Sequence, residues 1–553
     1  MAAVPLLAAA SLLAVPSPVH AAGTTWTVLT TADDTGTVAC LTPAHTCVTL
    51  RDAINQASSD VGDTISLGAH TYTLSTCTGV EPDAGALEID HDMTIRGQGS
   101  AKTTIAGGTC LGAGAWDNSL IVTCNSPALT VDGVTLTGGY ASNSSPSDSG
   151  TGGAINEGGI SFCDPSNLSL TMNDVDVFQN KASGNGGGIY TSGANVSLTN
   201  VTFSHNRSLN ETAGAMYFSG ANTLSMLNVY AHDNSQSCDC NTTSFLGGGA
   251  FRIIDTSTTA GTATNILIEH NTANGFTGGG VLQEGAGTVD WNNVTLDGNS
   301  APNDFGGGMY LTDGTTAKLT NVTATNNTAK SWGGAFGVGL LIAPSTLTIR
   351  AGTISGNSVT ASGGGGAIFT NSGPTTITQT ILHNNLANGA LNECTKALGG
   401  TIASGGYNLG DDTSCALSKA TDTQNAAKDP LLGSLATNSV SSGIPPVVGA
   451  GADSKALSTE ALGTGSPAID VVPGSFCPPP ATDERGVTRP QGAGCEIGAF
   501  EVQVVAVPVP VPTTGAVPAG PVSGLGYVLL VIGGLLGACV VGAPLRRRRH
   551  PTH

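Results

Sequence analysis

The chain has 553 residues, a formal net charge of −20, and charged side chains at only 10% of its positions. An acidic chain with so few charges disfavours nucleic acid and other polyanions as partners. Thr, Ser, Asn and Gly supply most of the remaining polar surface, which is typical of an extracellular solenoid.

The first 21 residues predict a secretory signal peptide. Residues 2–15 are small and apolar, and Val19-His20-Ala21 supplies a small-residue cleavage pattern. Of the 13 cysteines, one lies in a C-terminal apolar run, and the even number that remains indicates disulfides in an exported chain. The pairs closest in sequence are Cys40 with Cys47, Cys394 with Cys415, and Cys477 with Cys495. Pairing stays open for Cys77, Cys110, Cys124, Cys163, Cys238 and Cys240.

Residues 22–120 predict an N-terminal cap followed by the first coils of a solenoid. Leu50, Ala53, Ile54 and Ala57 fall on one face of a short helix, which suits a cap over an open coil. Residues 87–105 then supply the first strands.

One short pattern recurs through residues 121–390. Gly-rich hydrophobic starts, such as GGGIY (186–190) and GGGMY (306–310), alternate with segments that end in asparagine. A recurring period of about 30 residues indicates a solenoid, and Val, Ile, Thr and Leu at period two predict strands rather than helices. The predicted fold is therefore all-β, a parallel β-helix whose coils are joined by a ladder of stacked asparagines. The predicted ladder consists of Asn180, Asn206, Asn234, Asn271, Asn299, Asn327, Asn357 and Asn385.

One connection between an asparagine and the next Gly-rich start is longer than the others. It lies between Asn234 and Gly249 and carries Cys238, Asp239 and Cys240. Inserted loops on one side of a solenoid often build its binding face, so this loop is a candidate binding site. The alternative is an inert surface loop.

Both ends of the repeat region resemble known families. TLRDA (49–53) resembles the CSLREA-type N-terminal domain of bacterial surface β-helix proteins. The segment 391–501, with DERGVTRP (483–490) and CEIGAFE (495–501), resembles a choice-of-anchor C-terminal domain. The repeats are similar to those of polymorphic outer-membrane proteins. The resemblance spans residues 40–501 and implies a right-handed parallel β-helix of the pectin-lyase-like superfamily, displayed on a bacterial surface.

The last 52 residues predict an anchor. Residues 502–524 form a Pro-rich spacer, residues 525–543 a transmembrane helix, and residues 544–553 a basic cytoplasmic tail. The segment Val511-Pro512-Thr513-Thr514-Gly515 resembles a sortase sorting signal. Retention in the membrane and linkage to the cell wall by a sortase are the two alternatives for a chain exposed on the cell surface.

The acids of neighbouring repeats, such as Asp290, Asp297 and Asp304, form no recognisable hydrolase series, so no catalytic residue is predicted. His205, His270 and His383 fall on non-adjacent repeats and are interpreted as turn residues, so neither a metal site nor a cofactor is predicted. We therefore expect a surface protein with a structural or adhesive role that binds a glycan or a protein ligand. The alternative is a polysaccharide lyase or glycoside hydrolase.

Overall fold

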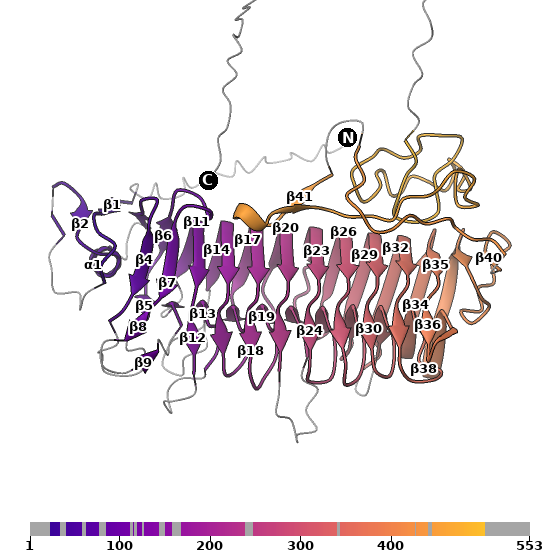
Figure 1. The fold of residues 1–553 in the computed structure, drawn as a ribbon, viewed down its shortest axis with the longest axis horizontal. Coiled ribbons are helices and arrows are strands. Elements are labelled where there is room, and N and C mark those ends of the chain that lie inside the picture. The colour runs from indigo at the N-terminus through magenta and orange to yellow at the C-terminus, as the bar shows by residue number, and fades with distance from the viewer. Residues whose placement is uncertain are drawn as a thin grey trace, which may run out of the picture. The chain divides into compact units, whose positions relative to one another are not determined.

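The computed structural model describes residues 23–33, 40–41, 43–57, 62–76, 85–110, 114–115, 119–123, 127–142, 150–157, 168–237, 247–339, 343–425, 427–440 and 445–503. They belong to one compact unit, Met1–Val505. Strands dominate this unit, and each coil pairs with the next through parallel strands (Figure 1). The fold is thus an all-β solenoid of parallel strands, the arrangement of a parallel β-helix, as the repeats predict.

Several predicted features lie outside the described residues. They are the signal peptide (1–21), the loop Cys238–Cys240, the sorting motif (511–515), the spacer beyond residue 503, the apolar run 525–543 and the tail 544–553. Within the part of the chain that is described, no helix has both the length and the apolar character needed to span a bilayer.

The N-terminal part contains one helix, α1 (Leu50–Gln56), beside short parallel strands. Thr49 and Asp52 form a reciprocal capping box, so two residues of the TLRDA motif start the helix. Leu50, Ala53 and Ile54 are buried, as their spacing predicts. The first strands are β1 (Thr25–Val28), β2 (Thr46–Cys47), β3 (Asp63–Ser66), β4 (Thr71–Leu74), β5 (Leu87–Ile89), β6 (Met93–Arg96), β7 (Thr104–Gly107), β8 (Thr109–Cys110) and β9 (Gly114–Ala115).

Seven of the eight Gly-rich starts lead into short strands, which stack in register with one another and with the strand at residues 121–123, and the eighth leads into a longer strand that begins at Ile368. The strands are β10 (Ile121–Thr123), β13 (Ile155–Glu157), β16 (Ile189–Ser192), β19 (Met216–Gly220), β22 (Phe251–Asp255), β25 (Val281–Glu284), β28 (Met309–Leu311) and β31 (Phe336–Val338). A Cβ on Gly249 would lie 1.9 Å from the carbonyl oxygen of Gly279 on the next coil. Glycine is therefore required here because neighbouring backbones approach too closely for a side chain. We call the outward side of these strands the short-strand face.

The second strand of each coil is long and bent. These strands are β11 (Ala128–Thr137), β14 (Ser169–Phe178), β17 (Asn195–Ser204), β20 (Leu224–His232), β23 (Gly261–Glu269), β26 (Thr288–Asp297), β29 (Thr316–Thr325) and β32 (Thr346–Ser355). Each bends at one residue with positive φ, for example Asn293 at 56° and Asn321 at 55°. Asparagine tolerates this left-handed conformation better than most residues, and the bend splits each strand between two sides of the solenoid.

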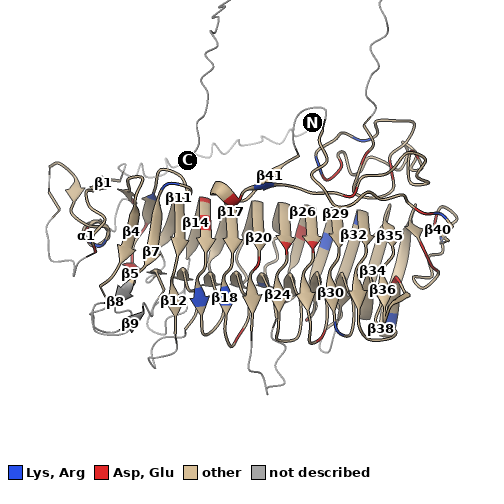
Figure 2. Cartoon of the chain, in the orientation of Figure 1, with Lys and Arg blue, Asp and Glu red and all other residues tan. Residues whose placement is uncertain are grey.

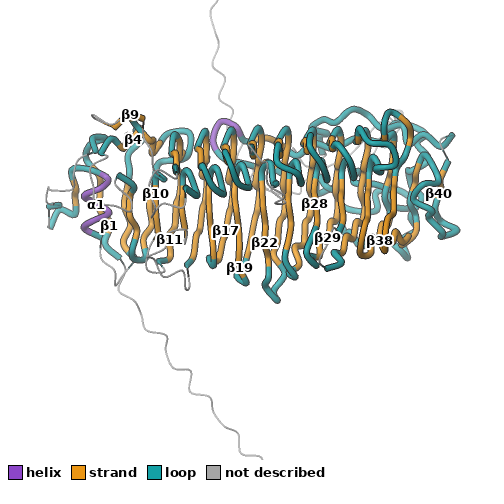
Figure 3. The backbone as a smooth tube through the Cα atoms, turned by 90° about the horizontal axis from the view of Figure 1, so that it is seen from below, coloured by secondary structure: helices purple, strands orange, loops and turns teal. Residues whose placement is uncertain are grey.

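Two-residue strands form the remaining corner of each coil. They are β12 (Tyr140–Ala141), β15 (Lys181–Ala182), β18 (Arg207–Ser208), β21 (Ser235–Gln236), β24 (Thr272–Ala273), β27 (Ser300–Ala301), β30 (Thr328–Ala329), β33 (Ser358–Val359), β36 (Leu386–Ala387) and β37 (Ala390–Leu391). Figure 3 shows the strands stacked side by side with the loops along their ends.

The eight asparagines of the predicted ladder directly precede these corners, and each is at most 1% exposed. From Asn206 onward, the side-chain oxygen of each accepts from the side-chain amide and the backbone N–H of the preceding member; from Asn299 to Asn327 both distances are 3.0 Å. The side-chain oxygen of Asn180, the first member, accepts from the backbone N–H of Gly139. These eight residues, the inner ladder, satisfy buried polar groups at every coil.

The solenoid continues past residue 391. Its last strands are β34 (Ile368–Thr378), β35 (Ile381–His383), β38 (Cys394–Gly406), β39 (Leu409–Gly410) and β40 (Thr423–Gln424). The chain then turns back, and residues 445–501, here called the return segment, lie along the outside of the long strands (Figure 1). The return segment contains β41 (Val447–Val448), the 3₁₀ turn η1 (Gly451–Asp453) and β42 (Lys455–Ala456).

Three of the expected disulfides are present: Cys40–Cys47, Cys394–Cys415 and Cys477–Cys495. The first lies beside α1, the second at the end of the solenoid, and the third within the return segment. The sulfurs of Cys77, Cys110, Cys124, Cys163, Cys238 and Cys240 lie outside what the structure describes.

Candidate functional site

The short-strand face carries a row of large side chains. Parallel register places Tyr190, Tyr217, Arg252, Leu282 and Tyr310 on successive coils of one row. These residues alternate with inward-facing core residues, which is why all of them point to the same side of the sheet. Because the repeat recurs on every coil, the side chains at this one position form a continuous row, which we call the stripe.

The first part of the stripe is a tyrosine–arginine stack. The rings of Tyr190 and Tyr217 lie 5.0 Å apart at an interplanar angle of 12°. The guanidinium of Arg252 lies over Tyr217 at 5.6 Å from the ring centroid, so the ring is contacted on both sides. Arg252 also forms a 2.6 Å ion pair with Glu284 and donates to the hydroxyl of Thr212 at 3.2 Å. These contacts fix the orientation of the Arg252 side chain.

The second part of the stripe is a cluster of aromatic rings around Tyr310 and Trp332. Trp332 stacks between Phe305 and Phe369, at centroid distances of 4.4 and 4.7 Å. Tyr310 packs 5.7 Å from Phe305 and covers Gly337, where a Cβ would lie 2.7 Å from the tyrosine ring. Phe305, Tyr310 and Phe369 are buried, whereas Trp332 is partly exposed, so this part is a packed apolar cluster of which only Trp332 reaches the solvent.

Three carboxylates surround this second part. Burial raises the pKa of Tyr310, and the charges of Asp304, Asp313 and Glu284 raise it further. Burial also raises the pKa of Asp304 to about 6, although a hydrogen bond from Ser331 and the charge of Lys330 oppose the shift. The pKa of Glu284 is raised by burial as well, against the lowering effect of Arg252. Perturbed carboxyls beside a tyrosine and an arginine are typical of functional sites, although structural networks show them too.

The acids singled out in the sequence do not converge. Asp290 lies before the bend of β26 and pairs with Lys318 at 3.2 Å. Asp297 lies after that bend and accepts from the amide of Asn326 at 2.9 Å. Asp304 belongs to the short-strand side of the coil. The three therefore lie on different sides of the solenoid. Asp411 directly follows β39 and pairs with His383 at 2.9 Å.

The sequence interpretation missed a second asparagine ladder. The amides of Asn228, Asn265, Asn293 and Asn321 each donate to the preceding member, which begins at Asn200, at 2.9–3.0 Å. Its signal in the sequence was the recurring Asn-Val-Thr, present at positions 200, 293 and 321.

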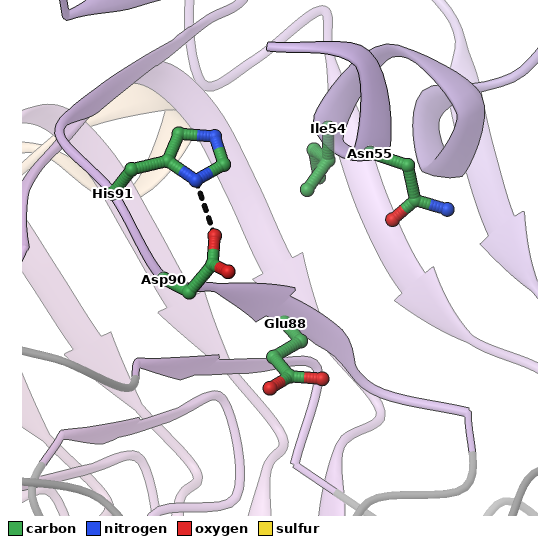
Figure 4. Close-up of a pocket in the computed structure, with 5 residues that line it drawn as sticks. All are labelled: Ile54, Asn55, Glu88, Asp90 and His91. Atoms are coloured by element: carbon green, nitrogen blue, oxygen red, sulfur yellow. Dashed lines mark ion pairs between the residues drawn. The ribbon is translucent and has the colours of Figure 1, made fainter. Parts of the chain in front are cut away.

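A separate hollow of about 340 Å³ lies at the N-terminal end (Figure 4). Ile54 and Asn55 of α1 face Glu88, Asp90 and His91 across it, and Nδ1 of His91 contacts the carboxylate of Asp90. The elements that line this hollow differ from those of the short-strand face.

Charged side chains are sparse along the coils, as Figure 2 shows. Comparison of the chain with protein-family models and with curated proteins found no match. The class that the fold defines is a disulfide-bonded, all-β solenoid of parallel strands.

Proposed function

We propose that this chain is an exported, surface-displayed parallel β-helix with a structural or adhesive role, and that its short-strand face binds a surface glycan. The observation that carries the proposal is the stripe in which tyrosine, arginine, tryptophan and carboxylate side chains occupy successive coils at the strand spacing of about 4.8 Å. Sugars offer hydroxyl groups for Arg252 and apolar C–H surfaces for the partly exposed rings of Tyr190, Tyr217 and Trp332.

The charge of the molecule narrows the ligand class. The net charge is −20, and the stripe itself combines one arginine with Glu284, Asp304 and Asp313. A polyanionic glycan would be repelled, so a neutral glycan fits better. Each of the two asparagine ladders joins successive coils by hydrogen bonds and so stiffens the solenoid. A stiff solenoid suits an adhesive role.

Export and anchoring are part of the same proposal. Three disulfides among the described residues support an oxidising compartment. The signal peptide at 1–21 and the membrane helix at 525–543 account for display, with sortase linkage through 511–515 as the alternative anchor. We also propose the right-handed form of the helix, a capping role for α1, and membership of the CSLREA and choice-of-anchor classes.

A second candidate function is polysaccharide cleavage at the same face. It is favoured by the raised pKa values of Asp304 and Glu284 beside Tyr310 and Arg252, since a carboxyl with a pKa of about 6 can act as an acid or a base. The adhesive role is preferred because the ion pair with Arg252 already engages Glu284.

The test is glycan binding by the purified full-length chain on an array of neutral and anionic polysaccharides. We expect binding to neutral glycans without release of reducing or unsaturated ends, and at least a tenfold loss of affinity in Tyr217→Ala and Arg252→Ala. Arg207→Ala, on the corner strand β18, is the matched control and should bind normally. Equal binding by all variants would reject the site, and product release abolished by Glu284→Gln would establish the enzyme instead.

A further inference from the structure

Two neighbouring turns bring together side chains that are typical metal ligands. His205 follows β17, His232 ends β20, and Asp233 follows it on the next coil. One donor atom from each residue lies within 4.8 Å of the donor atoms of the other two. The short-strand stripe shares none of these residues, so this cluster is independent of the proposed glycan site.

The backbone under this cluster is held in place. His205 and Asp233 have φ values of 57° and 53°, and each directly precedes a member of the inner ladder. The backbone N–H of Asn206 donates to the side chain of Asn234 at 2.9 Å, which ties the two turns together. His205 and Asp233 themselves are exposed. Because the backbone is fixed and two of the three side chains lie at exposed positions, small side-chain rotations can adjust the donor atoms without disturbing the coils.

The rings around the cluster orient His232. Its imidazole stacks on Tyr230 at a centroid distance of 4.4 Å and meets His205 edge to face at 5.7 Å. Phe178 contacts the other histidine in the same way, also at 5.7 Å. Nδ1 of His232 lies 2.8 Å from a carboxylate oxygen of Asp233. Both imidazoles are therefore placed by packing, and the carboxylate already faces one of them.

The ligand atoms of the cluster indicate which metal ion it would bind. Two imidazole nitrogens and one carboxylate oxygen suit zinc and neighbouring transition metals, whereas calcium and magnesium prefer oxygen ligands. At metal–ligand distances of about 2.0–2.1 Å, tetrahedral donors lie roughly 3.3 Å apart. The contact between His232 and Asp233 must open slightly and the other distances must shorten, which side-chain rotation at exposed positions can provide.

We propose that His205, His232 and Asp233 form a surface site for one divalent transition-metal ion, zinc being the best fit, with one coordination position left for water or an external ligand. The net charge of −20 favours cation binding further. The other turn histidines have different surroundings: His270 packs against Gly298, and His383 pairs with Asp411. His205, His270 and His383 were identified as turn residues from the sequence but His232 was not, because His232 lies one position earlier in its turn than His205 does.

The test is calorimetric titration of the purified full-length chain with Zn²⁺, with His550 and His553 replaced by alanine so that the tail does not contribute. We expect one strong site per chain, and roughly a tenfold or greater loss of affinity in His205→Ala, His232→Ala and Asp233→Ala. His270→Ala is the matched control and should retain the affinity of the parent chain. Circular dichroism of each variant without metal should show the parent's melting temperature, so that a folding defect is separated from a lost ligand.

A second readout uses Co²⁺ in place of Zn²⁺. A Co²⁺ absorption band in the visible region is expected in the parent and in His270→Ala, and a strongly reduced band in His232→Ala. No saturable binding by the parent, or equal binding by all four variants, would overturn the site. Glycan binding should be unchanged in His205→Ala, which keeps this proposal separate from the function proposed for the stripe.

Discussion

The carboxylate of Glu484 accepts a hydrogen bond of 2.6 Å from the hydroxyl of Thr323, although 161 residues separate the two in sequence. Its other oxygen accepts from Thr295 on the preceding coil at 2.7 Å. Glu484 belongs to the DERGVTRP motif and is completely buried. The motif therefore fastens the return segment to the solenoid, and comparable contacts recur at Thr202 with Ala450 and at Thr353 with Ala499.

Replacing Glu484 should loosen the return segment. Glu484→Ala removes the acceptor of the Thr323 hydroxyl, at a cost of about 1–3 kcal/mol for a buried group left unsatisfied, whereas Thr295 can still donate to the carbonyl of Ser458. We expect faster limited proteolysis within residues 445–501 while the coils stay protected. Glu484→Gln is the matched variant, because it keeps an acceptor and removes a carboxyl whose pKa burial raises well above its usual value. Identical cleavage rates for the alanine variant and the parent would contradict this role.

The inner ladder should be a major source of stability. Asn299 donates to the carbonyl of Ile268 at 2.8 Å and accepts from the backbone and side chain of Asn271. Asn299→Ala removes these bonds inside the core, so we expect a loss of about 2–4 kcal/mol in unfolding free energy. Denaturant unfolding measures this loss. Asn292→Ala is the control. Asn292 is half-buried on β26, the strand that precedes Asn299, and its replacement should change the unfolding free energy by less than about 0.5 kcal/mol. Equal effects at the two sites would argue against the ladder.

Stability should fall as the pH rises. Glu157 lies inside the solenoid between Thr123 and Thr191, and burial raises its pKa to about 8 from an ordinary 4.5. Between these values the folded state binds more protons than the unfolded state, so unfolding free energy decreases with pH. This contribution is complete below pH 4.5 and is lost as the pH rises through 8.

The check is the melting temperature from pH 5 to pH 9. Glu157→Gln should flatten the profile and raise stability above pH 8 by on the order of a few kcal/mol. Glu88→Gln, at an exposed position of β5, which is separated from the strand of Glu157 by β10, should leave the profile unchanged. Glu393 and Glu496 have a pKa of about 8 and 9 for the same reason, so some dependence should remain. A parent chain that gains stability towards pH 9 would refute this assignment.

The two C-terminal disulfides should stabilise different parts. Cys394–Cys415 and Cys477–Cys495 span 21 and 18 residues, and each is worth about 3 kcal/mol in the chain-entropy model. Replacing both cysteines of a pair by serine should lower the melting temperature in each case. Only the second replacement should increase proteolysis near Val472, which pairs with Cys495. Unchanged melting in both variants would show that these bonds contribute little.

The repeat pattern predicted most of the fold. Glycine is required where backbones approach within contact distance, and an asparagine is required at each inner turn, so both leave regular marks in the sequence. The helix at residues 50–56 and three disulfides were also predictable, because they depend on residues close in sequence. The second asparagine ladder, from Asn200 to Asn321, left the recurring Asn-Val-Thr in the sequence but was not predicted, because the bend in each long strand was not foreseen.

The candidate site was much less predictable. Arg252 and Tyr217 lie 35 residues apart, yet the register of parallel strands places them on adjacent coils. The proximity of His232 to His205 was not predicted either. The two residues occupy different positions in their turns, and they become neighbours only when the coils stack. Loop length between coils varies, so sequence spacing alone does not predict which outward residues become neighbours.

By itself, the sequence determined the local and periodic features: strands, tight glycine corners, the inner asparagine ladder and the nearest cysteine pairs. Only the tertiary structure decided which residues far apart in the sequence contact one another. It placed the return segment against the long strands, assembled the aromatic stripe, and brought two histidines and an aspartate together. The physical reason is that a solenoid repeats backbone geometry at short range, whereas side-chain neighbours across coils depend on the register of the whole stack.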